Sequence, residues 1–133
     1  MRIVAMGLTA LLVAVTLGMG GVWFVLGVST MEVVGGQDLG ALKDGAAFAF
    51  ADNAFRFFAG IWIATGIGLI YCLRDFDDRG LLLRIVMLGL FLGGVGRVFS
   101  MLQFGIVETM VPPTILELFL PPIIVWLQNR QKH

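Results

Sequence analysis

Four long apolar segments, separated by short polar stretches, restrict the fold of this chain more than any other feature. An α-helix needs about 20 consecutive apolar residues to cross the hydrocarbon core of a bilayer. Hydrophobic residues make up 59% of the chain and charged residues 14%, against about 45–50% and ~25% in soluble domains. We therefore predict an all-α, integral membrane bundle of four transmembrane helices. It forms a single membrane domain, residues 1–133, with spans at about 3–26, 53–73, 81–104 and 109–127 and a loop at 27–52.

The alternative for the first segment is a cleaved secretory signal peptide, because Arg2 precedes its apolar run. The apolar region of a signal peptide is about 7–15 residues long. The run from Ile3 to Leu26 is longer than that. Its length favours a retained membrane helix.

The distribution of charge predicts the orientation of the four helices. Cytoplasmic loops of membrane proteins collect lysine and arginine. Basic residues precede the first span, flank the tight turn between the second and third, and follow the fourth; they are Arg2, Arg74, Arg79, Arg84, Arg130 and Lys132. The loop at 27–52 is acid-rich instead, with Glu32, Asp38, Asp44 and Asp52 against Lys43. Both termini are therefore predicted to be cytoplasmic.

Local signals predict how the second and fourth spans are built. Asp52 or Asn53 is a natural N-cap for the second span, because a short polar side chain can accept from the first free N–H groups of a helix. The preceding loop has room for a short interfacial helix near residues 38–50. Pro121 and Pro122 interrupt the fourth span, where missing N–H groups are expected to kink or loosen the helix.

Small residues recur at four-residue spacing in the first three spans. This spacing places them on one helix face, and small residues let neighbouring backbones come close in a membrane. The stripes are Ala10, Ala14 and Gly18; Gly60, Ala64 and Gly68, following Arg56; and Gly89 and Gly93, preceding Arg97. We expect these faces to pack against other helices and to point both arginines into the protein.

Three ionisable side chains fall within the apolar spans: Arg56, Arg97 and Glu117. A charge in hydrocarbon costs roughly 2.5–3.5 kcal/mol on insertion scales, so each should have a partner. From the helix rise per residue, all three lie in the outer half of the bilayer. Further polar residues surround the same outer end of the bundle: Asp52, Asn53, Ser100, Gln103 and Glu108. We expect Arg97 to pair with Glu117, and Arg56 to be neutralised by Glu117, Asp52 or Glu108.

This cluster has a structural and a functional interpretation. In the structural one, the charges only hold the helices in register, and Arg56 is shallow enough to extend its guanidinium to the interface. In the functional one, they line the polar floor of a cavity that binds a small amphiphile or a lipid headgroup. Two arginines against one deep glutamate leave room for an anionic group.

Other chemistry finds little support in the sequence. His133 is the only histidine and Cys72 the only cysteine, so we predict no metal site and no cofactor. Ser100 has no histidine base within the spans, and we assign no catalytic residue. The formal net charge is zero, so no basic surface for nucleic acid is expected.

Three stretches carry a family resemblance. They are FRFFAGIWIATGIGLIYCL, LGGVGRVFSMLQFG and LELFLPPIIVWL. They resemble small bacterial four-helix membrane proteins of the domain-of-unknown-function family DUF4345. The matching positions are Asn53, Arg56, Gly93, Gly94, Arg97, Glu117, Pro121 and Pro122. The architecture is also similar to that of DoxX-like proteins. The resemblance implies a multi-pass protein of the bacterial cytoplasmic (inner) membrane, and no reaction.

The sequence favours a non-enzymatic membrane protein, either a bundle that binds a lipid or quinone-like amphiphile or an accessory subunit. Its expected partners are the lipid bilayer and another membrane protein or a second copy of the chain. One alternative is a membrane enzyme in which Glu117 transfers a proton on a lipophilic substrate. Another is a small proton-coupled transporter, although such proteins use a glutamate in the first helix, which has no acid here.

Overall fold

The computed structural model describes residues 1–40 and 45–130. Lys43 and Asp44 of the predicted outer loop, and Lys132 and His133 of the basic tail, lie outside these ranges. The described chain forms two compact units, one of residues 1–11 and 68–133 and the other of residues 12–67. Two helices, α1 (Arg2–Leu26) and α3 (Ala46–Arg74), each contribute to both units.

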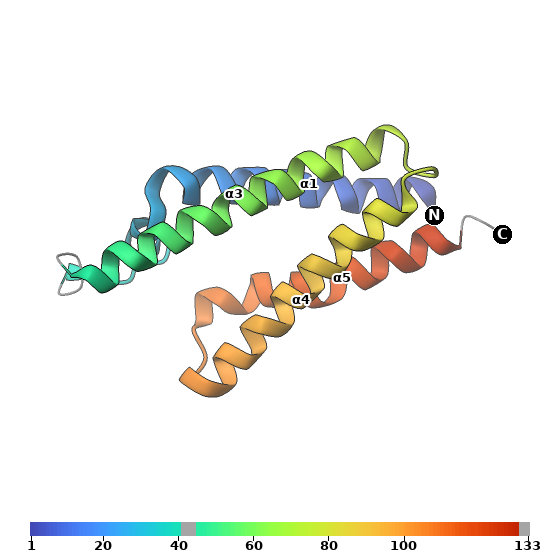
Figure 1. Ribbon diagram of the computed structural model, residues 1–133. Helices are drawn as coiled ribbons and strands as arrows, with labels where there is room; N and C mark the ends of the chain where they lie inside the picture. The colour runs from blue at the N-terminus through green and yellow to red at the C-terminus, as the bar shows by residue number, and fades with distance from the viewer. Residues whose placement is uncertain (41–44, 131–133) are drawn as a thin grey trace. The chain divides into compact units, whose positions relative to one another are not determined.

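All regular structure in the described residues is helical, which confirms the predicted all-α class (Figure 1). Four helical segments are long and apolar enough to cross a membrane. The elements are α1 (Arg2–Leu26), η1 (Gly27–Ser29), α2 (Thr30–Val33), α3 (Ala46–Arg74), α4 (Gly80–Phe104), η3 (Glu108–Met110) and α5 (Val111–Asn129). Helix α5 remains α-helical through Pro121 and Pro122.

Helix α3 begins earlier than the sequence suggested. It starts at Ala46, so Asp52 and Asn53 lie inside it, and the predicted N-cap is wrong. Of the predicted interfacial helix near 38–50, residues 41–44 lie outside the described ranges, and residues 46–50 form the first turns of α3. The alanine-rich stretch before Asp52 sustains a helix well. The Asp52 carboxylate instead accepts hydrogen bonds from the Val28 N–H and the Arg56 side chain.

Within the unit of residues 12–67, α1 and α3 meet through glycines other than the predicted ones. A Cβ on Gly20 would lie 3.0 Å from Cγ1 of Ile63, and one on Gly66 would lie 2.6 Å from Cδ2 of Leu17. Thr16 is buried here and its hydroxyl donates to the Leu12 carbonyl oxygen at 2.7 Å. Gly20 and Gly66 therefore allow the close approach of the two helices.

The predicted small-residue stripes do not make these contacts. Ala10, Ala14, Gly18, Ala64 and Gly89 are exposed. Added Cβ atoms at Gly18, Gly60, Gly68 and Gly89 would meet nothing within 4 Å. The prediction of close packing within the chain is wrong for these residues, whereas a Cβ on Gly93 would lie 3.8 Å from Glu117 Oε2. A spacing of four residues identifies a helix face but does not say which neighbour that face meets.

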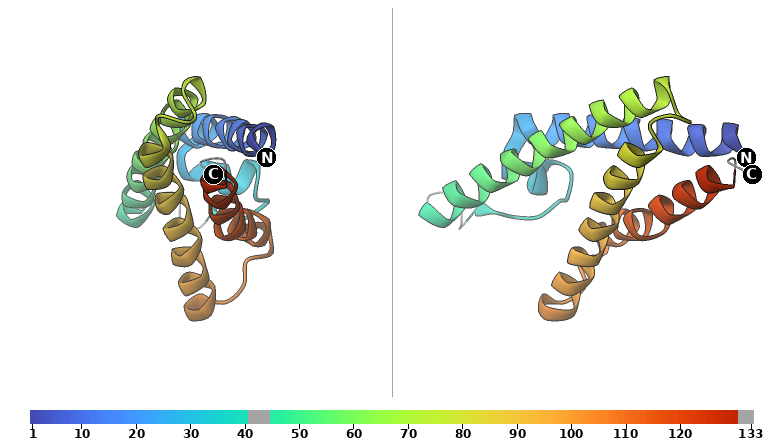
Figure 2. Two further views of the ribbon diagram at one scale, coloured as in Figure 1. Left: turned by 90° about the vertical axis from the view of Figure 1, so that its right-hand side faces the viewer. Right: turned by 45° about the vertical axis from the view of Figure 1, so that its right-hand side comes forward.

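Within the unit of residues 1–11 and 68–133, α4 and α5 lie side by side and antiparallel (Figures 1 and 2). Their shared end also holds the turn before α4. The buried Gln128 side chain donates through Nε2 to the Phe76 carbonyl oxygen at 3.1 Å. At this end too, Arg2 of α1 pairs with Asp77 at 3.2 Å. A hydrogen bond and an ion pair therefore join the end of α5 and the start of α1 to the turn before α4.

Candidate functional site

The expected ion pair between Arg97 and Glu117 is present and joins α4 to α5. Arg97 Nε donates to Glu117 Oε2 at 2.8 Å, and Nη2 donates to Oε1 at 3.3 Å. The Glu117 side chain is 8% exposed and that of Arg97 25%. Two parallel bonds between a guanidinium and a carboxylate form the strongest common geometry for such a pair. Each charge therefore has its counter-ion within the same helix pair.

The remaining contacts of Arg97 and the adjacent turn of α5 complete this site. Arg97 Nη1 donates to the Met110 sulfur at 3.3 Å. Thr114, one turn before Glu117, is buried and donates its hydroxyl to the Met110 carbonyl oxygen at 2.7 Å. Sequence reasoning missed Met110, because a thioether is only a weak hydrogen-bond acceptor.

Gly94 brings the two helices close enough for the pair to form. A Cβ added there would lie 3.0 Å from Cβ of Glu117 and 3.2 Å from its backbone carbonyl carbon. At Gly93 the nearest such contact is Glu117 Oε2 at 3.8 Å. The close approach therefore occurs one position further along the helix than predicted.

We expect Gly94→Val to lower the free energy of unfolding by about 1–3 kcal/mol, because overpacking against a backbone cannot relax easily. Gly96→Val is the matched control, since a Cβ there would meet nothing within 4 Å. The measurement is unfolding of the purified protein in mixed detergent micelles. Equal stability of the two variants would contradict the proposed contact.

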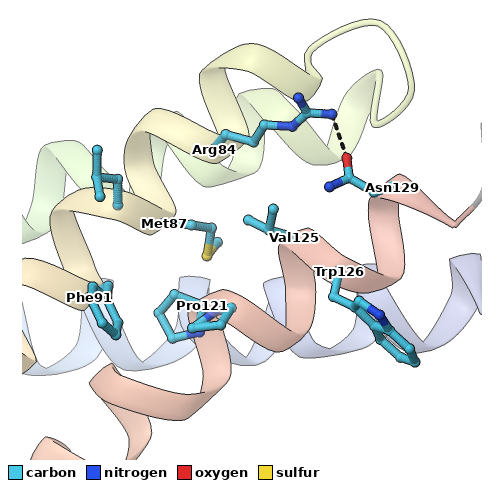
Figure 3. Close-up of a pocket in the computed structure, with 9 residues that line it drawn as sticks. Arg84, Met87, Phe91, Pro121, Val125, Trp126 and Asn129 are labelled. Carbon is cyan, nitrogen blue, oxygen red and sulfur yellow. Dashed lines mark hydrogen bonds between the residues drawn. The ribbon is translucent and has the colours of Figure 1, made fainter.

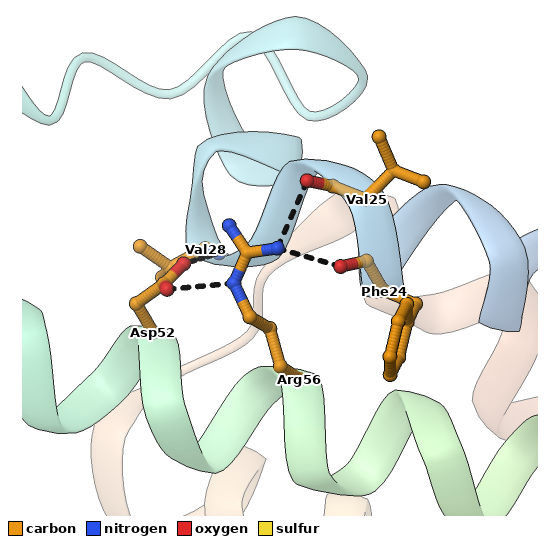
Figure 4. A network of polar contacts seen from close by, with 5 residues as sticks. All are labelled: Phe24, Val25, Val28, Asp52 and Arg56. Carbon is orange, nitrogen blue, oxygen red and sulfur yellow. Dashed lines mark hydrogen bonds and ion pairs between the residues drawn. The ribbon is translucent and has the colours of Figure 1, made fainter.

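Arg56 belongs to a different network, which joins the end of α1 to α3 (Figure 4). Its Nε donates to Asp52 Oδ2 at 2.8 Å, and its Nη1 donates to the carbonyl oxygens of Phe24 and Val25 at 2.6 and 3.0 Å. Asp52 Oδ1 accepts from the backbone N–H of Val28 at 2.9 Å. A cation at free carbonyls of a helix C-terminus is favourable. We call these residues the α1 clasp.

The α1 clasp also explains a local backbone feature. Gly27 has a φ of 59°, a left-handed conformation that glycine adopts without steric cost. This turn at the end of α1 carries the chain into η1, so that the Val28 N–H reaches Asp52. Of the three carboxylates considered for Arg56, the structure therefore pairs it with Asp52.

The other predicted site residues make no polar contact among the described parts of the chain. Asn53, Ser100, Gln103 and Glu108 are exposed. The Arg97–Glu117 pair and the α1 clasp belong to different compact units. The prediction that both lie around one shared cavity stays a prediction. In the described residues no group of three His, Cys, Asp or Glu side chains could hold a metal ion.

A groove of about 450 Å³ lies between α4 and α5 (Figure 3). Its walls are apolar apart from one end, where Arg84 Nη2 donates to Asn129 Oδ1. The lining residues are Arg84, Met87, Leu88 and Phe91 from α4 and Pro121, Pro122, Val125, Trp126 and Asn129 from α5. Proline rings reach less far across a helix interface than leucine or phenylalanine side chains, which leaves space beside Met87.

Sequence reasoning did not identify this groove. The signal was the spacing of Arg84, Met87, Leu88 and Phe91, which places them on one face of a helix. The same spacing describes an ordinary packing stripe. Only the structure shows that α5 leaves part of this helix face uncovered.

The class of the protein follows from its helices, and its family follows from a match to a family model. Four helices long and apolar enough to cross a membrane are the pattern of a multi-pass membrane protein. The family model described as domain of unknown function (DUF4345) matches residues 3–128. The chain belongs to this family. No curated protein and no solved structure matches it.

The structure gives several motif residues of the family resemblance a physical role. Arg97 and Glu117 form the ion pair between α4 and α5. Gly94 lies against Glu117, and Arg56 closes the α1 clasp. Pro121 and Pro122 line the groove. Among these residues, only the two prolines line the groove.

Proposed function

We propose that this chain is a non-enzymatic, multi-pass protein of the bacterial cytoplasmic membrane that binds a small amphiphile or lipid. The observation that carries the proposal is the groove between α4 and α5. Its volume of about 450 Å³ falls within the range of roughly 300–1,000 Å³ typical of small-molecule sites. Its apolar walls suit a hydrocarbon chain or an isoprenoid tail.

The Arg97–Glu117 pair supports this function by holding α4 and α5 in register. Its two charges neutralise each other, so the pair offers an incoming anion little net attraction. A pair buried between two elements specifies their alignment. We therefore assign the pair a positioning role, and we place the ligand in the groove further along the same helices.

Both termini and the Arg84 end of α4 are proposed to face the cytoplasm. The contacts of Arg2 with Asp77 and of Arg84 with Asn129 gather basic residues at one end of this unit. Basic residues at a membrane boundary favour the cytoplasmic side.

Catalysis or proton-coupled transport by Glu117 receives less support. Its carboxylate accepts two N–H groups of Arg97. With both carboxylate oxygens bonded to Arg97, neither oxygen is free to contact a substrate.

An accessory-subunit role has one observation in its favour. The stripe of Ala10, Ala14 and Gly18 is exposed on α1, and small residues are common where membrane helices meet. Such a role requires a second protein chain, or a second copy of this one, on that face.

Native mass spectrometry of the gently extracted full-length protein tests the proposal. We expect one amphiphile of defined mass to be retained per chain. Leu88→Trp fills the groove and should remove that adduct, whereas Leu102→Trp, at an exposed α4 position outside the groove, should retain it. Retention by both variants would refute the groove as the binding site, and a co-purifying protein would favour the accessory role.

A further inference from the structure

The two ends of the groove differ in chemistry. Phe91 and Pro121 lie toward one end, and Arg84 and Asn129 at the other (Figure 3). About 10 Å of helix rise separates Arg84 from Phe91. A ligand that follows the groove therefore needs an apolar chain and, at the Arg84 end, a polar headgroup.

The polar end carries positive charge without a counter-ion. Arg84 bonds to the neutral amide of Asn129. The Arg130 guanidinium lies 4.4 Å from the ring centroid of Trp126, which lines the groove. In the described residues, neither arginine forms an ion pair with an aspartate or glutamate. This end is therefore complementary to an anion.

Both arginines are at the level where lipid headgroups are expected. Arg84 lies in the second turn of α4, which begins at Gly80, and Arg130 follows the last residue of α5. Tryptophan favours the same interfacial level, and Trp126 is half-exposed there. A phosphate bound by these guanidinium groups would leave its acyl chain free to enter the apolar groove.

We propose that the groove selects an anionic phospholipid from the leaflet at the Arg84 end. This inference rests on the proposed function and adds the class of ligand. Arg84 and Arg130 bind the headgroup phosphate, since guanidinium groups match phosphate oxygens in geometry and charge. The acyl chain lies against Met87, Val125 and Phe91. A neutral quinone would leave both charges uncompensated.

The test is a titration of the full-length protein in neutral detergent with phosphatidylglycerol or phosphatidylcholine, followed by native mass spectrometry. We expect the wild type to prefer phosphatidylglycerol. The double variant Arg84→Gln, Arg130→Gln should lose about 30-fold in affinity for that lipid, at about fivefold per arginine near a membrane surface. Its affinity for phosphatidylcholine should change much less.

Arg74→Gln is the matched control for charge. Arg74 is exposed, lies outside the groove and changes the net charge in the same way as either single substitution. If it lowers phosphatidylglycerol affinity as much as Arg84→Gln does, the effect is one of general surface charge and the inference is wrong. Circular dichroism and thermal unfolding verify that each variant is folded.

Leu88→Trp separates this inference from the proposed function. If it abolishes binding of both lipids and the wild type shows no preference between them, the groove binds lipid but the headgroup inference is overturned. If both lipids bind equally well with the groove filled, the proposed function itself fails. Loss of binding in Leu88→Trp, together with loss of only the phosphatidylglycerol preference in the double glutamine variant, supports both.

Discussion

Replacing Glu117 with leucine is expected to lower the free energy of unfolding by about 3–5 kcal/mol, the usual cost of removing one partner of a buried ion pair. Arg97 would keep its charge, because a guanidinium does not deprotonate in proteins. Its side chain is 25% exposed, so the unpaired guanidinium can move partway toward a polar boundary. The expected loss of stability is therefore near the lower limit of this range. Unfolding in mixed micelles of a mild detergent and dodecyl sulfate measures the change.

The reciprocal and double variants show how much of this cost belongs to the unpaired charge. Arg97→Leu should likewise lower the free energy of unfolding, because it leaves the buried Glu117 carboxylate without its partner. The double leucine variant should return to within about 1–2 kcal/mol of the wild type, since an apolar pair can replace a buried ion pair. Additive losses in the double variant would contradict a direct interaction.

The same double variant distinguishes a positioning role from a ligand-binding role of the pair. If it folds and retains the amphiphile seen with the wild type, the Arg97–Glu117 pair acts only on helix alignment. If it folds with unchanged stability but loses the amphiphile, the polar pair itself contacts ligand, contrary to the role proposed above.

Gly27→Ala is expected to lower the free energy of unfolding by about 1.5–4 kcal/mol. A left-handed backbone costs an L-residue roughly 1–2 kcal/mol, and loss of a capping interaction adds about 0.5–2 kcal/mol. Both apply here, because φ is 59° and an added Cβ would lie 1.8 Å from Asp52 Oδ1. The carboxylate would have to leave the α1 clasp. The same micelle unfolding assay measures the loss.

Gly36→Ala provides the control for backbone strain alone. Gly36 has a φ of 64°, and a Cβ there would meet nothing within 4 Å. Its substitution should therefore cost only the backbone contribution. In an Asp52→Ala background the cost of Gly27→Ala should fall to that of Gly36→Ala. If Gly27→Ala is no worse than Gly36→Ala in the wild-type background, the clasp does not contribute to stability.

The Arg97–Glu117 pair could be predicted from sequence because the physics that selects it is local and strong. A charge within an apolar helix needs a partner, and the two helices that carry these residues are joined by a short connection. Few other groups were available to either side chain. Arg56 had three candidate carboxylates, and the structure pairs it with the one on its own helix, four residues away.

The predicted stripes failed for a physical reason that applies to the whole chain. The stripes combine glycine with alanine, and a spacing of four residues shows only that such residues share one face of a helix. Gly20, Gly66 and Gly94 lie close against a neighbouring helix, whereas Gly18, Gly60, Gly68 and Gly89 do not. Their role depends on the rotation of each helix about its axis, which periodicity alone does not determine.

The sequence by itself determined the helical class, the four segments able to cross a membrane and the need for Arg97 to find a carboxylate. These follow from segment length, from apolar composition and from the cost of charge in hydrocarbon, all of which are properties of one segment at a time. Only the tertiary structure decided which glycines lie at contacts, that Arg56 closes the end of α1, and that α4 and α5 leave a groove beside Met87. Each of these depends on the distance between two helices and on their rotation, which arise from packing between segments.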